Sequence, residues 1–401
     1  MKQWKLGLVM LAGIVLIGAG VGYRHYEQHQ AAVVLQKKQA ATKRAKASKR
    51  AARVKRETVK KRKLAEKINA DPFSKTESTN QQITSMLDAD QFVGTALVVK
   101  DNKVIYQKGF GYADYAKKVK NGPHSMFQIL SIQKSLTAAG IMQLVQAGKI
   151  KLSDKLSKYY PSITHGDDIT IRMMLDMSTG LQLKKAPETA LPENQVVNFA
   201  VTNATYNSKI HGTFNYAPVN FLLLAGIIRQ QSGVSYKQYF KKHFIQKLNL
   251  QETGFVTDKL SENATKGYFA TKTQVNADYT PEATESRAQM TYELGTGQIF
   301  MSASDLFKSE AAILKGRLLS KANVDILHTR SATGPYAGGL YRISSKTLRL
   351  HGVGYGQESA VMISNDGKNG VVLLSNYGRQ ALNMPGTTSK IYEEMMQGNL
   401  N

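Results

Sequence analysis

A serine and a lysine three positions apart form the residue pair in this sequence best suited to nucleophilic chemistry. Ser131-Ile132-Gln133-Lys134 begins an amphipathic stretch that predicts a helix over 131–147. Residues at this offset share one helical face, about one turn apart. A desolvated lysine loses its proton near neutral pH and can then draw the proton from the serine, while the helix N-terminus helps an oxyanion form. Alone, the motif also fits a helix-capping serine followed by a surface lysine.

The composition excludes several competing chemistries. The 401 residues include no cysteine, which rules out disulfide scaffolds, zinc fingers, iron–sulfur sites and thiol nucleophiles. The sequence has no Gly-x-Ser-x-Gly elbow, no His-Glu-x-x-His motif and no phosphate-binding Gly-rich loop. Its eight histidines are scattered without paired spacing, so neither a metal nor an organic cofactor is expected.

Strand patterns near the two ends of the chain enclose a helical middle. A β-rich run at 92–99, a turn at 101–102 and a further run at 104–106 predict one hairpin, and 360–364 with 371–374 around the turn 365–367 predict a second. Helices are expected at 131–147, 221–231, 236–247 and 391–397. This order predicts an antiparallel sheet built from both termini, with helices packed on it.

Several sequence blocks follow one another in a familiar order. The chain resembles the β-lactamase-related serine hydrolases, which include class C β-lactamases, D,D-peptidases and esterases of D-alanylated wall polymers, over residues 80–395. The resemblance implies a β-lactamase/transpeptidase-like fold of α/β (α+β) type that also has an all-helical region. The blocks that carry it are 92–100, 110–114, 126–138, 169–181, 214–226 and 351–354.

The resemblance also implies roles for individual residues. Ser131 would be the acylated nucleophile, Lys134 its proton partner, and Tyr216 a phenol that helps to move the proton. His351 matches the first position of the family's third motif and would contact a substrate carboxylate or the tyrosine oxygen. The backbone N–H groups of Ser131 and Gly354 would form the oxyanion hole.

Two positions depart from the family pattern. Pro218 replaces the asparagine of the Tyr-x-Asn motif, so Asn220 is the candidate substitute for holding the substrate. Val353 replaces the glycine of the third motif and is expected to narrow the approach to that strand. An ester lacks the amide N–H and demands less of this contact than a peptide or β-lactam. Leaving-group choice would depend on loops such as 182–212 and 257–290, which the sequence alone does not resolve.

The N-terminal region indicates a membrane anchor. A basic lead, 1–5, precedes 18 uncharged and mostly apolar residues, 6–23, close to the roughly 20 needed to span a bilayer. A cleavable signal peptide is the alternative. The flanking charges place the amino end inside, so a single-pass membrane protein with an extracellular catalytic domain is expected.

Most of the formal net charge of +25 lies in this region. The stalk, 24–79, contains fifteen Lys and Arg residues against two Glu residues between positions 37 and 67. It is either a charged spacer or a binding segment for anionic lipid or wall polymer, and an extracellular location argues against nucleic acid. The sequence as a whole predicts an extracellular serine hydrolase for D-alanyl ester or peptide linkages in peptidoglycan or D-alanylated teichoic acid. The alternative is a catalytically weak or inactive module that binds wall polymer.

Overall fold

Two compact units, Met1–Ala70 and Asp71–Asn401, make up the chain. The computed structural model describes residues 76–400 except 259–260, 271–276, 330–333 and 379–382, together with residues 30, 32, 34–50, 52–53 and 56 of the first unit. Residues 34–50 form a helix whose side chains are all exposed, as expected for a charged helix without an apolar stripe. The predicted span at 6–23 falls outside the described residues. No helix within them has the length and apolar character to cross a bilayer.

A seven-stranded antiparallel sheet, in the order β11-β12-β13-β14-β15-β1-β2, forms the centre of the second unit. Strands from near the two ends of the sequence pair within this sheet, where Thr95 of β1 lies opposite Leu374 of β15. This confirms the predicted sheet from both termini and both predicted hairpins. The strands are β1 Gly94–Lys100, β2 Lys103–Phe110, β11 Tyr336–Ala337, β12 Leu340–Arg342, β13 Thr347–Gly354, β14 Gln357–Ser364 and β15 Gly370–Ser375.

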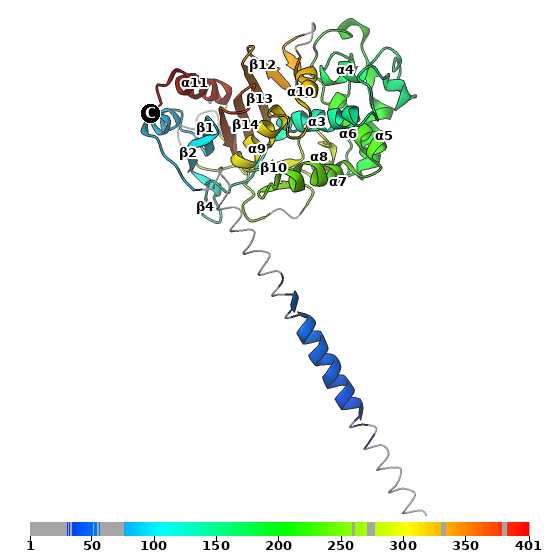
Figure 1. The fold of residues 1–401 in the computed structure, drawn as a ribbon, viewed down its shortest axis with the longest axis vertical. Coiled ribbons are helices and arrows are strands. Elements are labelled where there is room, and N and C mark those ends of the chain that lie inside the picture. Colours follow the sequence, from blue (N-terminus) through cyan, green and yellow to red (C-terminus); the bar gives the residue numbers. More distant parts are fainter. Residues whose placement is uncertain are drawn as a thin grey trace, which may run out of the picture. The chain divides into compact units, whose positions relative to one another are not determined.

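Helices cover both faces of the sheet (Figure 1). Because side chains alternate along a strand, Ala96 and Val98 face one side and Leu97 and Val99 the other. The first side packs against α2, Gln81–Ala89, and α11, Met384–Gln397. The second side packs against the larger core, which includes α3, Gln133–Gln146, and α9, Ala303–Leu314.

A second group of helices lies beside α3 and surrounds α6, Val219–Ser232 (Figure 1). Residues 219–228 of α6 are all buried, so this helix packs on every side. The predicted helix at 221–231 is confirmed, and Gly233 ends it in the left-handed conformation. An all-helical region was expected here, but β6 and β7 form a small antiparallel pair within it.

The remaining elements are short. The helical ones are η1 Leu130–Ile132, η2 Leu156–Lys158, α4 Ile171–Leu175, α5 Glu193–Asn203, η3 Ser208–Ile210, α7 Tyr236–Phe240, the π-helical segment Lys241–Gln246, α8 Arg287–Tyr292 and α10 Lys321–His328. The strands are β3 Tyr112–Asp114, β4 Val119–Lys120, β5 Phe127–Gln128, β6 Leu181–Gln182, β7 Thr205–Tyr206, β8 Thr253–Phe255, β9 Tyr268–Phe269, β10 Ile299–Met301 and β16 Tyr377–Gly378.

A buried hydrogen bond ties the start of α3 to α9. Ser135, which follows Lys134 in the sequence, donates its hydroxyl to Glu310 Oε2 at 2.8 Å, and both residues are only 1% exposed. Burial raises the pKa of the Glu310 carboxyl from 4.5 to about 8. The native state therefore holds a proton here that the unfolded chain releases at lower pH.

Replacing Glu310 by Gln should change how stability depends on pH. In the native protein, this carboxyl lowers the free energy of unfolding by roughly 1 kcal/mol for each unit of pH between about 4.5 and 8. The side chain of Glu310→Gln does not titrate. The melting temperature of this variant, relative to that of the unmodified protein, should therefore increase as pH rises through this range. Thermal unfolding at several pH values measures the effect. A constant difference between the two proteins would contradict it.

Candidate active site

A strained turn places Ser131 at the start of α3. Ser131 lies in η1, directly after Leu130, whose φ of 51° is uncommon for a bulky residue. Strand β13 packs closely against this turn: a Cβ on Gly352 would stand 2.8 Å from the Ser131 nitrogen and 2.5 Å from the Ile129 oxygen. A side chain at position 352 would therefore displace the turn that carries Ser131.

The structure brings the three predicted catalytic side chains together. Lys134 Nζ and the Tyr216 hydroxyl each lie 2.9 Å from Ser131 Oγ, and both donate hydrogen bonds to it. Lys134 Nζ also donates to the backbone oxygen of Thr296 at 3.3 Å. The ring of Tyr216 packs edge-on against the buried ring of Tyr336, with 6.0 Å between centroids. The serine oxygen thus has a candidate base and a candidate acid within reach.

Burial separates the proton affinities of the two donors. Lys134 is 1% exposed, and desolvation lowers the pKa of its ammonium to about 8, although the charge of Glu293 opposes this shift. Tyr216 is 39% exposed as a residue, but its hydroxyl turns inward to Ser131. Desolvation raises the pKa of that phenol and the Glu293 charge adds to the rise, although the hydrogen bond to Ser131 opposes it. Near neutral pH, Lys134 is consequently the group that can lose its proton, and Tyr216 keeps its own.

Glu293 is a charged residue of this site that the sequence did not reveal. It follows α8 and lies in the segment that leads to Thr296, three residues beyond the loop 257–290 predicted to shape the cleft. Its Oε2 accepts a hydrogen bond from Thr296 Oγ1 at 2.7 Å, and its Oε1 accepts one from the Tyr355 hydroxyl at 3.3 Å. The sequence around it matches no catalytic motif, so only the fold shows that this carboxylate lies near Lys134.

The first residue of the third family motif, His351, is paired with a carboxylate on the next strand. His351 Nε2 lies 2.8 Å from Glu358 Oε1 on the neighbouring strand, and no hydrogen bond among the described residues joins it to Ser131 or Tyr216. Val353 is 66% exposed, on the strand face opposite Gly352. Because side chains alternate along β13, the glycine that permits the close contact with the Ser131 turn is Gly352. That Val353 narrows the approach to this strand stays a prediction. Gly354 adjoins Leu130, so its amide remains the predicted second oxyanion donor.

Asn220 does not replace the missing amide of the Tyr-x-Asn motif. Pro218 is the N-cap of α6, and Asn220 falls within the first turn of that helix, where it is 1% exposed. Its Oδ1 accepts from Thr179 Oγ1 at 2.7 Å, and its Nδ2 donates to the Ala217 oxygen at 3.0 Å. This amide therefore stabilises the start of α6 inside the protein and does not point into the cleft.

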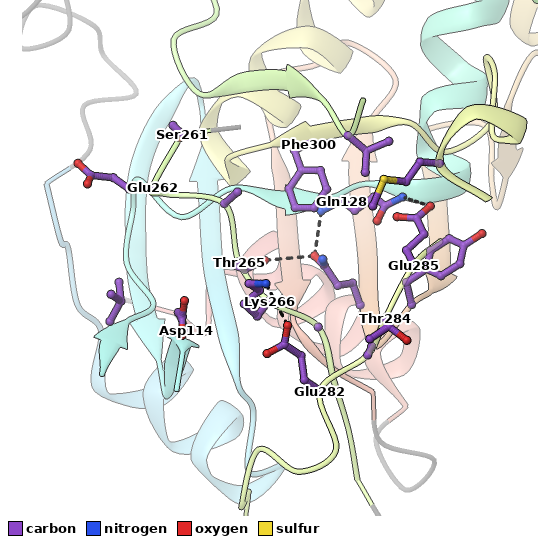
Figure 2. Close-up of a pocket in the computed structure, with 18 of the residues that line it drawn as sticks. Asp114, Gln128, Ser261, Glu262, Thr265, Lys266, Glu282, Thr284, Glu285 and Phe300 are labelled. Carbon is purple, nitrogen blue, oxygen red and sulfur yellow. Dashed lines mark hydrogen bonds and ion pairs between the residues drawn. The ribbon is translucent and has the colours of Figure 1, made fainter. Parts of the chain in front are cut away.

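Two cavities are lined by a hydrogen-bonded pair of residues, the larger by Tyr355 and the smaller by Glu293. The larger, of about 770 Å³, lies beside β5 and the segment 261–267, with Gln128 and Glu285 on its wall (Figure 2). The smaller, of about 340 Å³, is lined by Tyr216, Glu293 and Thr296. Ser131 and Lys134 line neither cavity, but Tyr216, which donates to Ser131 Oγ, lines the smaller one, so the reacting serine lies next to the smaller cavity. Within the described residues, no cluster of His, Asp or Glu side chains is placed to hold a metal.

Known proteins share both the sequence and the fold. The chain is 29% identical over 324 residues to the putative penicillin-binding protein PbpX of Bacillus subtilis, covering 80% of each chain. It is 28% identical over 327 residues to a teichoic acid D-alanine hydrolase of Staphylococcus aureus, covering 80% of this chain and 78% of that protein. The crystal structure of FmtA from S. aureus superposes with a TM-score of 0.70 at 26% identity, over 82% of this chain and 88% of that one.

The family assignment agrees with the sequence-based resemblance. A family model described as Beta-lactamase matches residues 79–386, which is most of the second unit and includes all three catalytic candidates. The nucleophile motif, the strand beside it and the sheet built from both termini all lie within the matched range. The chain therefore belongs to the beta-lactamase family of serine hydrolases.

Proposed function

We propose that this protein hydrolyses D-alanyl esters of a cell-envelope polymer through an acyl-enzyme on Ser131. The observation that carries the proposal is the pair of 2.9 Å contacts that Lys134 and Tyr216 make with one serine oxygen. A nucleophile held between a lysine of lowered pKa and a protonated phenol suits acyl transfer, in which a proton must leave the serine and another must reach the leaving group.

The contacts divide the steps among the three side chains. Neutral Lys134 takes the serine proton while Ser131 Oγ bonds to the carbonyl carbon, and the negative charge moves to the carbonyl oxygen near the Ser131 and Gly354 amides. The ester C–O bond then breaks. Tyr216 gives its proton to the departing alcohol and regains one from Lys134. A water molecule repeats the sequence on the acyl-enzyme, which releases D-alanine and free Ser131.

The missing amide favours an ester over a peptide. Asn220 is buried and Pro218 has no side-chain donor, so neither supplies the amide contact that the family motif would give to a peptide or lactam substrate. An alkoxide is also a better leaving group than an amide nitrogen. The likeness to teichoic acid D-alanine hydrolases supports a D-alanyl group as the acyl part.

The location is part of the proposal. Residues 6–23 would anchor the chain in the membrane, and the flanking charges would place Ser131 outside. The stalk has fifteen Lys and Arg residues between positions 37 and 67 and would hold the hydrolase near anionic lipid or wall polymer. No nucleic acid is required by any part of this scheme.

Acylation of Ser131 is the primary test. The full-length chain incubated with an activated D-alanyl thioester should gain the mass of one alanyl group on the peptide that contains Ser131, and it should release D-alanine. Ser131→Ala should show neither. Equal D-alanine release by both proteins, or no labelling of the native chain, would contradict the proposed function.

The rate should follow the ionisation of Lys134. Because the base form accumulates as pH rises through about 8, kcat/KM should increase as pH rises from about 6 toward that value. Lys134→Arg keeps the positive charge but cannot lose its proton, so kcat should fall on the order of 10²–10⁴-fold. Initial rates across the pH range measure both effects, and a profile that is flat between about pH 6 and 9 would refute the assignment of Lys134 as the base.

A further inference from the structure

Glu293 places a carboxylate in the small cavity without a cationic partner in contact. It is half-buried and lines this cavity with Tyr216 and Thr296. Its two hydrogen-bond donors, Thr296 and Tyr355, are neutral hydroxyl groups. No lysine, arginine or histidine among the described residues forms an ion pair with it. A partly desolvated carboxylate in this situation attracts a cation from solution.

The carboxylate is fixed close to the reacting serine. A Cβ on Gly297 would lie 2.7 Å from Glu293 Oε2 and 3.5 Å from Leu130 Cα, so a single glycine separates Glu293 from the turn that carries Ser131. Thr296 links the same carboxylate to the site on another side, because its backbone oxygen accepts from Lys134. Glu293 has no hydrogen bond to Ser131, Lys134 or Tyr216 within the described residues, so it is not placed to take the serine proton directly.

The acyl donor of the proposed reaction carries a cation near its reactive carbon. In an aminoacyl ester, the α-ammonium is two bonds from the carbonyl carbon, which must approach within about 3–3.5 Å of Ser131 Oγ to react. Because Tyr216 reaches Ser131 Oγ and also lines the small cavity, an acyl donor at the serine can extend its ammonium into that cavity. In a peptide or β-lactam substrate, the corresponding nitrogen is acylated and carries no charge. A carboxylate here would bind the charged aminoacyl esters in preference to the uncharged N-acylated substrates.

The rim of the cavity suits the rest of such a substrate. Lys184 lines the same cavity and is exposed, so its charge is screened by solvent and lies toward the outside. A phosphate of a polymer chain would meet this ammonium at the entrance, while the aminoacyl group meets the carboxylate inside. The cavity thus offers charges of opposite sign to the two ends of a zwitterionic repeat unit.

We infer that Glu293 recognises the free α-ammonium of the acyl donor and makes the site selective for aminoacyl esters over N-acylated substrates. The inference rests on the proposed function, whose acyl-enzyme chemistry it extends to a specific substrate class. Glu293 acts as a binding group for the substrate, distinct from the proton-transfer roles of Lys134 and Tyr216. The same contact holds the carbonyl carbon in line with Ser131 Oγ.

A matched pair of esters tests the inference. D-alanyl and N-acetyl-D-alanyl esters of the same alcohol differ in the charged nitrogen, and comparing protein variants cancels their different intrinsic reactivities. Glu293→Gln keeps the size of the side chain and one acceptor oxygen, which serves either Thr296 or Tyr355, but it loses the charge. It should lower kcat/KM for the D-alanyl ester by about 10- to 100-fold, mainly through KM, and change the N-acetyl ester by less than about 3-fold. The control is Glu285→Gln, which removes a carboxylate from the larger cavity. It should leave the ratio of kcat/KM for the two esters unchanged.

A binding measurement needs no turnover. The Ser131→Ala chain should bind D-alaninamide, a cationic analogue, and adding Glu293→Gln should weaken that binding by about 10-fold. The inference would be overturned if Glu293→Gln left the ratio of kcat/KM for the two esters unchanged. An equal loss of kcat/KM on both esters would mean that Glu293 acts only through Lys134. Unchanged affinity for D-alaninamide would overturn it as well. A native chain that binds D-alaninamide through Glu293 but is never acylated would support ammonium recognition and refute the hydrolase.

Discussion

The burial of one ammonium group is the constraint on which the site depends. Lys134 lies almost entirely inside the protein, and its charged form has Ser131 Oγ and the Thr296 oxygen as hydrogen-bond acceptors. Desolvation makes the charged form costly, so the lysine becomes a usable base near neutral pH. The neighbouring carboxylate, Glu293, limits this shift, because its charge favours the protonated lysine. A substrate ammonium paired with Glu293 would weaken that restraint and favour the neutral lysine as the substrate arrives.

The fold excludes water from the Lys134 side chain and holds its hydrogen-bond partners in position. Helices α3 and α6 are buried on nearly all sides, which fixes the helix that carries Ser131 and Lys134 and the loop that carries Tyr216. Strand β13 presses Gly352 against the Ser131 turn from the sheet side. Rigid elements from three distant parts of the sequence thus meet at Ser131, and such preorganisation is what acyl transfer requires of a protein.

Sequence patterns predicted the parts of this structure that depend on local spacing. Periodicity and turn residues predicted the hairpins, the long buried helices and the offset between Ser131 and Lys134. Tyr216 was identified from the order of the family's sequence motifs. Tertiary packing decided the rest. His351 pairs with Glu358 across two strands, and Asn220 turns inward because Pro218 starts α6 just before it. Glu293 belongs to no motif, so its position in the cavity appears only when the chain is folded. The predicted membrane span and stalk remain sequence-based predictions for most of their length.

The central claim is that burial lowers the pKa of Lys134, and direct titration of that side chain tests it most sharply. NMR of the lysine Cε and Nζ nuclei in isotopically labelled native protein, with the Lys134 signal assigned from its loss in Lys134→Met, reports this pKa without any substrate. The structure predicts a midpoint of about 8. A midpoint at or above 10.5, the ordinary value for lysine, would contradict it.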